Sequence, residues 1–350
     1  MSFREDFDSI LEAIRVNPKT SAEEFQRQVM PLIQFIRENT PERLFKFRAC
    51  TSKNLSAFEK DEIWLSTAAS FNDLHDSLLF FDKKSILSFI QEAFSTGLLL
   101  PRFKERFEFL SNQQHLTPEF QQQAARALSS LNGTQSADVF MKALGDFELF
   151  LDQCFASLKD GVRTSSKMAC LSESIKSPLM WAHYADNSKG FALGYDFRNN
   201  QVTQCSNCPN RSCNKFMSGT IYPVVYSDCR FDATNYGQWY VQWYLGQQLG
   251  IPTEELYHDS FLHIKTALHK SNDWAYENEW RIICSTSDDE LEAKKHYPIK
   301  KQAVAIYFGC QISDKDKDIL TTIADQKGIA KYQMKVTDYS SKYELDFEPM

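Results

Sequence analysis

The stretch that decides the fold is residues 270–283, which read KSNDWAYENEWRII. Its second half is expected to run as a strand, in which successive side chains point to opposite faces of a sheet. Glu277, Glu279 and Arg281 would then share one face, opposite Trp280. This alternation predicts a strand with one charged face and one buried face. The alternative is a surface strand whose charged face holds only a Glu–Arg ion pair.

Other short runs that are apolar or alternate in polarity lie on both sides of this stretch. Such runs are typical of strands when Gly, Pro, Asn or Asp bound them. They predict an α+β protein with a mixed or antiparallel β core. The expected strands are residues 44–47, 63–65, 168–171, 191–197, 220–225, 279–285 and 304–309.

Two regions show helical periodicity instead. Apolar residues recur at helical spacing over residues 3–39, which indicates helices before the core, and again over most of residues 83–160. The second region lies between strand signals and predicts a helical insertion. The expected division is therefore residues 1–42 as N-terminal helices, 43–82 and 164–350 as the two parts of the core, and 83–163 as the insertion.

A short helix is expected directly before the strand at 191–197. Ser177 is a good N-cap, Pro178 fits the first helical turn, and Gly190 is a stop after the helix Leu179–Asp186. Trp181 and Tyr184 fall on one side of this helix and His183 on another. The simplest interpretation of Trp181 is a core anchor, and that of His183 a satisfied polar group.

The composition is that of an ordinary globular protein. Hydrophobic residues make up 43% and charged residues 24% of the 350, which excludes a wholly disordered chain. The net charge of −7 disfavours nucleic-acid binding without a local basic patch. No stretch has the length and apolarity of a membrane span or a signal peptide, so a cytoplasmic protein with no membrane partner is expected, and export by a route without such a signal is the alternative.

The cysteine-rich loop at residues 204–214 is the clearest candidate metal site. Cys205, Cys208 and Cys213 have the spacing Cys-x2-Cys-x4-Cys, and thiolates are good ligands for a tetrahedral zinc ion. A fourth ligand is absent from the loop, and the candidates are Cys229 and, further away, His183. Such a closed site would be structural, and the alternative is a set of free thiols, which the odd number of cysteines also fits.

Three separated blocks carry a resemblance to a known family. Residues 64–73 read WLSTAASFND, residues 180–191 read MWAHYADNSKGF, and residues 274–281 read WAYENEWR. In this order they look like an uncharacterised bacterial family known only as a domain of unknown function. The resemblance covers about residues 43 to 310 without the insertion and the cysteine loop, and it implies no chemistry by itself.

A more distant resemblance, to ADP-ribosyltransferases, implies an activity. Residues 277–279 resemble the Glu-x-Glu strand of those enzymes, Ser66-Thr67 is similar to their Ser-Thr motif, and Arg48 would stand where they place an arginine or a histidine on the first core strand. The resemblance implies an α+β fold and a transferase that uses NAD as its substrate. It would act as a bacterial toxin or an anti-phage defence effector on an unknown macromolecular acceptor, a protein or a nucleic acid.

The same resemblance implies residue roles. Glu279 would be the catalytic carboxylate that faces the positive charge developing on the ribose, Ser66 would orient either Glu279 or the ribose, and Glu277 would activate or recognise the acceptor. The residues expected to bind NAD are Arg48, which would clamp the pyrophosphate, Thr67, Tyr184, which would stack on nicotinamide, Trp181 and Arg281.

Two other functions remain open at this stage. A metal-dependent nuclease would want an Asp followed by Glu-x-Lys, but Trp280-Arg281 follows the Glu-x-Glu motif and no lysine stands in that place. A non-catalytic binding module of a defence system would use the aromatic blocks only to hold the fold.

Phe71-Asn72-Asp73 is expected to form a turn or to cap a helix.

Overall fold

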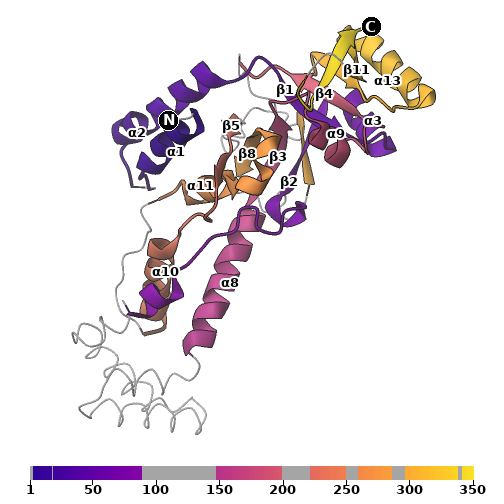
Figure 1. Ribbon diagram of the computed structural model, residues 1–350. Coiled ribbons are helices and arrows are strands. Elements are labelled where there is room, and N and C mark those ends of the chain that lie inside the picture. Colours follow the sequence, from indigo (N-terminus) through magenta and orange to yellow (C-terminus); the bar gives the residue numbers. More distant parts are fainter. Residues whose placement is uncertain are drawn as a thin grey trace, which may run out of the picture. The chain divides into compact units, whose positions relative to one another are not determined.

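The computed structural model describes residues 3–17, 19–88, 147–198, 221–249, 259–285, 296–337 and 341–350. The chain divides into two compact units. The first comprises Met1–Leu78, Val162–Arg230 and Phe261–Met350, and the second Leu79–Gly161 and Phe231–Ser260. Figure 1 shows their helices and strands in the labels used below.

The first unit is built on a ten-stranded, mostly antiparallel sheet, which confirms the predicted α+β class. Its main path runs β12-β11-β10-β4-β1-β3-β2-β9, and β8 pairs with β3 and with β5. Within the described part of this sheet, β10 and β11 pair in parallel and the other strand pairs are antiparallel. The strands are β1 (Leu44–Arg48), β2 (Glu62–Thr67), β3 (Ser166–Ser172), β4 (Phe191–Tyr195), β5 (Ile221–Pro223), β8 (Glu279–Ser285), β9 (His296–Lys300), β10 (Ala305–Phe308), β11 (Ala330–Val336) and β12 (Leu345–Pro349). A second, parallel pair is formed by β6 (Val225–Ser227) and β7 (His269–Ser271).

Strand β3 lies at the branch point of the sheet. All of it pairs with β8, from Ser166↔Ser285 to Ser172↔Glu279. On its other edge β2 pairs near its start and β1 meets it only at Phe45↔Ser172. Because directly paired residues project to the same face, this register places Phe45, Ser172 and Glu279 side by side.

Helices cover both faces of this sheet. On one face, Phe58 of α3 and Leu320 of α13 join a core of strand residues such as Trp280 and Ile282. On the other, Trp181 of α9 packs edge-on against Phe47 of β1. The helices of this unit are α1 (Phe3–Ala13), α2 (Ala22–Asn39), α3 (Ser52–Glu59), α9 (Pro178–Tyr184), α11 (Leu262–Leu268), α13 (Asp314–Lys327) and the 3-10 helices η1 (Ala68–Ser70) and η2 (Asn272–Glu277).

The structure confirms the helices that the periodicity of residues 3–39 predicts, as α1 and α2. Phe7 and Leu11 of α1 and Leu32 of α2 are buried in one cluster, which also includes Met168 and Ile283 from the sheet. Ser21 caps α2 by accepting a hydrogen bond from the backbone N–H of Glu24. These helices therefore pack on the core as well as preceding it.

The second unit contains the described ends of the predicted insertion. Residues 83–88 and α8 (Phe147–Ser165) are helical, and this unit holds α8 as far as Gly161 together with α10 (Thr234–Leu249). The Phe81 and Phe155 rings stack with their centroids 4.5 Å apart. Residues 89–146 lie outside the described residues, so a helical layer across 83–163 stays a prediction.

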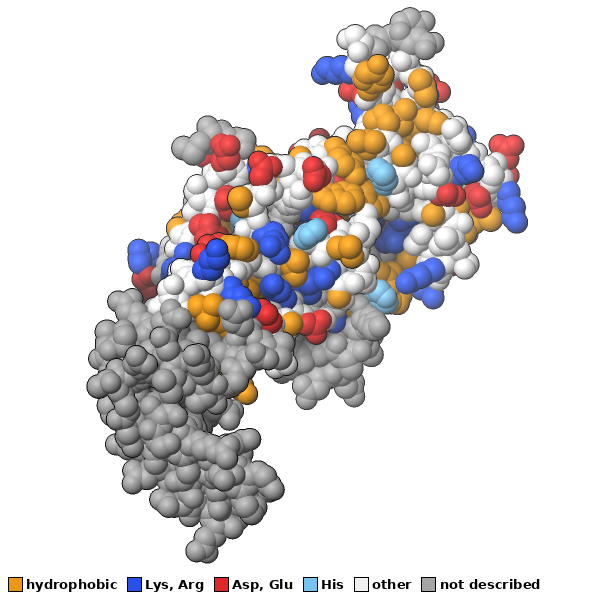
Figure 2. Space-filling view, turned by 60° about the horizontal axis from the view of Figure 1, so that its bottom comes forward, with side chains coloured by type: hydrophobic (Ala, Val, Ile, Leu, Met, Phe, Trp, Pro, Cys, Tyr) orange, Lys and Arg blue, Asp and Glu red, His pale blue; other side chains and the backbone are white. Residues whose placement is uncertain are grey.

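The surface of the described residues is mixed in charge. On the face that Figure 2 shows, Lys and Arg side chains are interspersed with acidic, apolar and His side chains. Among the helices that the structure describes, none combines the length and the apolar character required to cross a membrane.

Candidate functional site

The Glu-x-Glu motif lies at the junction between η2 and β8. Ser271 caps η2 by accepting a hydrogen bond from the N–H of Asp273, and Glu277 is its last residue. Asn278 adopts a left-handed conformation (φ 44°), which Asn tolerates better than most residues, and Glu279 then begins β8. The prediction that Glu277 belongs to the strand is therefore wrong, because the left-handed residue ends η2 directly after it.

Lys270 holds the two glutamates together from β7. Its Nζ donates hydrogen bonds to Glu277 Oε2 at 2.5 Å and to Glu279 Oε2 at 3.0 Å. The side chains of all three residues are at most 5% exposed. In so little water an unpaired carboxylate would be costly, so Lys270 is what allows two glutamates to lie so close.

Arg281 balances the negative charge of the Glu279 carboxylate from the side opposite Lys270. Its Nε donates to Glu279 Oε1 at 2.8 Å, and its two Nη atoms donate to the carboxylate of Asp76 at 2.8 and 2.5 Å. Further bonds run from Nη1 to the carbonyl of Ala267 and from Nη2 to Glu279 Oε2. These bonds account for all five N–H donors of the guanidinium. Arg281 thus holds the carboxylates of Glu279 and Asp76 in place, and its role in binding NAD stays a prediction.

Tyr184 of α9 provides a hydrogen bond to the second carboxylate oxygen of Glu277. The Tyr184 hydroxyl donates to Glu277 Oε1 at 2.5 Å, and it accepts a hydrogen bond from Asn72 Nδ2 at 3.3 Å. Ser177 caps α9 as predicted. The cap and the following turns of the helix aim Tyr184 at the carboxylate.

The segment after η1 forms the predicted turn. Asp73 Oδ1 accepts a hydrogen bond from the N–H of His75 at 2.8 Å, which is the geometry of an Asx turn. Ser77 then donates its hydroxyl to Asp76 Oδ1. This turn brings Asp76 under Arg281 and Asn72 beside Tyr184.

A cavity of about 160 Å³ opens onto this network. Its walls are largely apolar, and its polar groups come from the residues described above together with Lys46 and Ser172. The arrangement suits one flat ring with a polar or positively charged edge. The lining is Phe45, Lys46, Phe47, Phe71, Asn72, Asp76, Cys170, Leu171, Ser172, Met180, Tyr184, Lys270, Glu277 and Glu279.

The two glutamates have pKa values shifted in opposite directions. Burial raises the pKa of Glu277, the negative charge of Glu279 raises it further, and Lys270 only partly opposes them. Burial also acts to raise the pKa of Glu279, but the charges of Arg281 and Lys270 outweigh it and hold this pKa well below its usual range. Glu279 is thus a fixed negative charge, and Glu277 is the carboxyl group that gains a proton more easily.

Lys46 adds a second, half-buried amine at the cavity. Burial lowers its pKa, and its Nζ donates to the carbonyl of Cys170 at 2.7 Å, where β1 separates from β3. Burial raises the pKa of the Cys170 thiol, and Glu279 raises it further. Cys170 is therefore a thiol, not a thiolate nucleophile, in this surrounding.

The other residues expected at the NAD site lie outside the cavity lining. Ser66 Oγ is 2.9 Å from His296 Nδ1, and Thr67 is buried. Arg48 donates from Nη1 to Asn54 Oδ1, while its Nε and Nη2 are buried without a hydrogen-bond partner.

Trp181 anchors α9 in the hydrophobic core, which is the simplest interpretation of this residue in the sequence. Its ring is fully buried, and its Nε1 donates to the carbonyl of Ile175 at 2.7 Å. The ring supports α9 from beneath. Of the residues assigned roles from the sequence, the structure brings Glu277, Glu279, Tyr184 and Arg281 together.

The cysteine site falls largely outside the described residues. Cys205, Cys208 and Cys213 are not among them, and the fourth candidate, Cys229, is exposed with its N–H donating to Ser227 Oγ. A structural zinc at these cysteines stays a prediction.

Sequence reasoning missed Lys270 and Asp76. Lys270 opens the stretch from which the analysis began, but its spacing from Glu277 matches no motif. Asp76 follows the turn at Asn72, yet nothing in the sequence shows that it meets Arg281. Two buried glutamates only two positions apart, Glu277 and Glu279, require nearby cations. That requirement was the signal in the sequence that could have pointed to Lys270.

Comparison with known proteins gives one family match. Residues 180–282 match the model of the family described as Protein of unknown function (DUF2971). The matched segment begins in α9 and ends in β8, so it includes Tyr184, Lys270 and both glutamates. No curated protein and no solved structure matches the chain.

Proposed function

We propose that the chain is an ADP-ribosyltransferase-like enzyme that cleaves the bond between nicotinamide and ribose in NAD. The observation that supports this proposal is the pair of buried carboxyl groups, Glu277 and Glu279, which share Lys270 at a cavity and have pKa values shifted in opposite directions. Such a divergence separates a fixed charge from a group that exchanges protons.

The proposed chemistry uses the two groups differently. As the nicotinamide bond breaks, its electron pair leaves with the neutral ring and positive charge develops on the ribose. Glu279, which stays ionised, faces that positive charge and stabilises it. Glu277, in its ionised form, accepts the proton of the attacking water or acceptor hydroxyl, because a raised pKa makes a carboxylate a better base.

The walls of the cavity match the leaving group. Phe45, Phe47 and Phe71 offer flat apolar surfaces, and Asn72 and Ser172 offer polar atoms for a carboxamide. A cavity of about 160 Å³ accommodates a single ring, so the rest of the dinucleotide would lie beyond its mouth. Arg48, Ser66 and Thr67 are outside this nicotinamide subsite.

The nuclease alternative has less support from the same geometry. The carboxylates of Asp76 and Glu279 are both bonded to Arg281, and Lys270 occupies the remaining side of Glu279. A hydrated Mg²⁺ needs free carboxylate oxygens, which this arrangement does not offer. A binding module that uses the network only to hold the fold would show no turnover.

The test incubates the full-length protein with NAD labelled in the adenylate part and follows free nicotinamide, ADP-ribose and labelled macromolecules. Nicotinamide release with either product supports the proposal, and the labelled product identifies water, protein or nucleic acid as acceptor. Nucleic-acid cutting that depends on a metal ion would favour the nuclease. If the protein neither hydrolyses NAD, nor labels a macromolecule, nor cuts nucleic acid, the binding module is favoured. Glu62→Gln, at a surface ion pair with Lys300, is the control that should retain full activity.

A further inference from the structure

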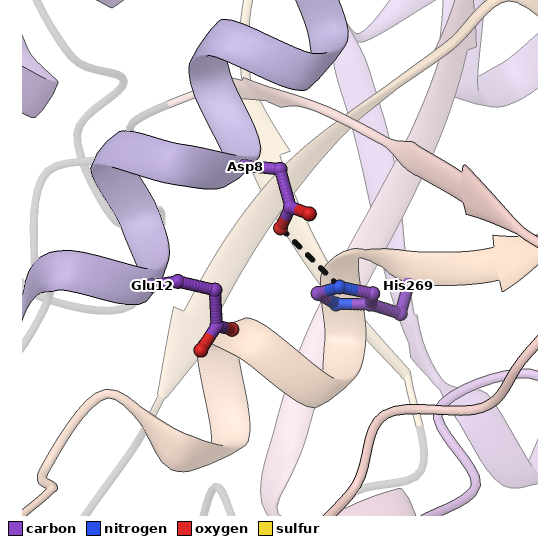
Figure 3. Close-up of side chains that lie close together, drawn as sticks. All are labelled: Asp8, Glu12 and His269. Carbon is purple, nitrogen blue, oxygen red and sulfur yellow. Dashed lines mark ion pairs between the residues drawn. The ribbon is translucent and has the colours of Figure 1, made fainter.

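A second cluster of ionisable side chains lies between α1 and β7, away from the cavity lining. Asp8 and Glu12 are one helical turn apart on α1 and therefore share a face. His269 is the first residue of β7. Figure 3 shows the Asp8 carboxylate pointing at the His269 imidazole, with the Glu12 carboxylate on the same side of α1. One ligand atom from each residue can be chosen so that all three lie within 4.8 Å of one another.

The spacing of two of these atoms already fits a metal ion. Asp8 Oδ1 and His269 Nε2 are 3.4 Å apart. Ligands at about 2.0–2.2 Å from a tetrahedral zinc ion are separated by roughly 3.3–3.6 Å. Only Glu12, which is half-buried, would have to move inward, by a rotation of its side chain.

The imidazole is oriented for metal binding by a hydrogen bond on its far side. His269 Nδ1 lies 2.7 Å from the carbonyl oxygen of Lys265. Because a carbonyl oxygen only accepts, Nδ1 carries the hydrogen, and in the neutral ring the lone pair is on Nε2, which faces Asp8. A hydrogen bond from the second nitrogen to a carbonyl is the usual support of a metal-binding histidine.

The carboxylates each contribute one oxygen that has no other partner. Asp8 Oδ1 and Glu12 Oε1 are shielded from water and accept no hydrogen bond, and the contact between Asp8 and His269 lacks hydrogen-bond alignment. Shielded carboxylate oxygens without a donor are destabilising. A bound cation would compensate both at once.

The surroundings leave space for the remaining ligands. A cavity of about 410 Å³ borders Asp8 and His269 and is also lined by Tyr226, Ser227 and Asn272. Water molecules can enter it and complete the coordination shell. Three protein ligands with an open position distinguish this cluster from a closed structural site.

We infer that Asp8, Glu12 and His269 bind one divalent transition-metal ion of the zinc type. One imidazole nitrogen and two carboxylate oxygens suit such an ion, whereas Ca²⁺ needs six to eight oxygen ligands. The ion connects α1 to β7. It does so independently of the function proposed for the cavity.

The test titrates full-length, chelator-treated protein with Zn²⁺ by calorimetry and with Co²⁺ by visible spectroscopy. Protons compete for the imidazole: burial lowers the pKa of His269, but the nearby Asp8 carboxylate and the hydrogen bond with the Lys265 carbonyl outweigh this and raise it. The titrations are therefore made at about pH 8. Cobalt also separates this site from the cysteine loop, because thiolate ligands add strong near-ultraviolet absorption and nitrogen and oxygen ligands do not.

The expected result is one Co²⁺ per chain with a spectrum free of thiolate absorption, in addition to any bound by cysteines. His269→Gln and Asp8→Asn should each weaken this binding by at least ~10-fold, while Asp6→Asn, on the exposed side of the same helix, should not. Asp8→Asn keeps the shape of the side chain and serves if His269→Gln misfolds. Equal binding by wild type and Asp8→Asn overturns the inference, and so does exclusively thiolate-type absorption.

Discussion

His269 and Lys270 are neighbours in β7, and their side chains enter two different charged clusters. His269 Nε2 lies 3.4 Å from Asp8 Oδ1, while Lys270 Nζ bonds Glu277 and Glu279. Successive residues of a strand project to opposite faces, which explains the divergence. The short strand β7 thus carries one residue of each proposed site.

Lys270 should be essential to the stability of the fold. Lys270→Met leaves two buried carboxylates without their shared cation and is expected to reduce the free energy of unfolding by about 3–5 kcal/mol. Adding Glu277→Gln should recover part of that loss, because one of the repelling charges is removed. Urea unfolding measures both. Lys300→Met, at the exposed pair with Glu62, should cost less than about 1 kcal/mol. Equal effects at the two lysines would contradict the description of the site.

Tyr184 should tune the proton affinity of Glu277. Its hydrogen bond acts to lower the pKa of Glu277, so Tyr184→Phe should raise that pKa further. The acidic limb of the pH–rate profile for NAD cleavage should then move to higher pH. Tyr276→Phe, beside Glu277 in η2, is the matched control and should leave the limb in place. An unchanged profile in Tyr184→Phe would show that Glu277 is not the base.

Gly190 should tolerate no side chain. A Cβ built there would lie 2.1 Å from the backbone oxygen of Arg48, a contact that forces β1 and β4 apart. Gly190→Ala is expected to destabilise the protein by roughly 2–3 kcal/mol, as overpacking in a core does. Gly161→Ala has open space around the new methyl group and should be neutral or slightly stabilising in its helix. Thermal unfolding of the two variants provides the comparison.

The two glutamates should give opposite pH dependences of stability. Glu279 has a folded pKa below its ordinary value of 4.5, so its stabilisation is complete above that pH and is lost as the pH falls through the folded value. Glu277 has a folded pKa above 4.5, so its contribution falls as the pH rises from 4.5 through the folded value.

Urea unfolding at a series of pH values separates these contributions. Relative to wild type, Glu277→Gln should gain stability as the pH rises above 4.5. The deficit of Glu279→Gln should be largest above 4.5 and shrink in acid. Parallel curves for both variants would mean that their pKa values are not shifted in opposite directions.

The sequence predicted those parts of the fold that depend on local patterns. The strands near residues 44–47, 63–65 and 168–171 are confirmed as β1, β2 and β3, and the helix after Ser177 as α9. Each has its apolar spacing or its cap within a few residues. The α+β class follows from these elements and is confirmed too.

The rest of the site depends on contacts between residues far apart in the sequence. Asp76 and Arg281 meet only because the turn after η1 lies beside β8, and no local pattern encodes that meeting. Glu277 was assigned to the strand because the alternation of side chains continues through Asn278, whereas Asn278 has a left-handed conformation and ends η2 there. The helix α3 between β1 and β2 was not predicted, since its eight residues are too few to show a clear period.

The most direct test of the proposed function is the rate of nicotinamide release from NAD by wild type, Glu277→Gln and Glu279→Gln, each corrected for its folded fraction by circular dichroism. The wild type is predicted to release nicotinamide. Glu279→Gln should be slower by at least ~10²-fold, because it removes the charge opposite the ribose. Glu277→Gln should reduce transfer to the acceptor more than it reduces nicotinamide release. A wild-type protein that does not bind NAD, or a Glu279→Gln variant that releases nicotinamide as fast as wild type, would contradict the account.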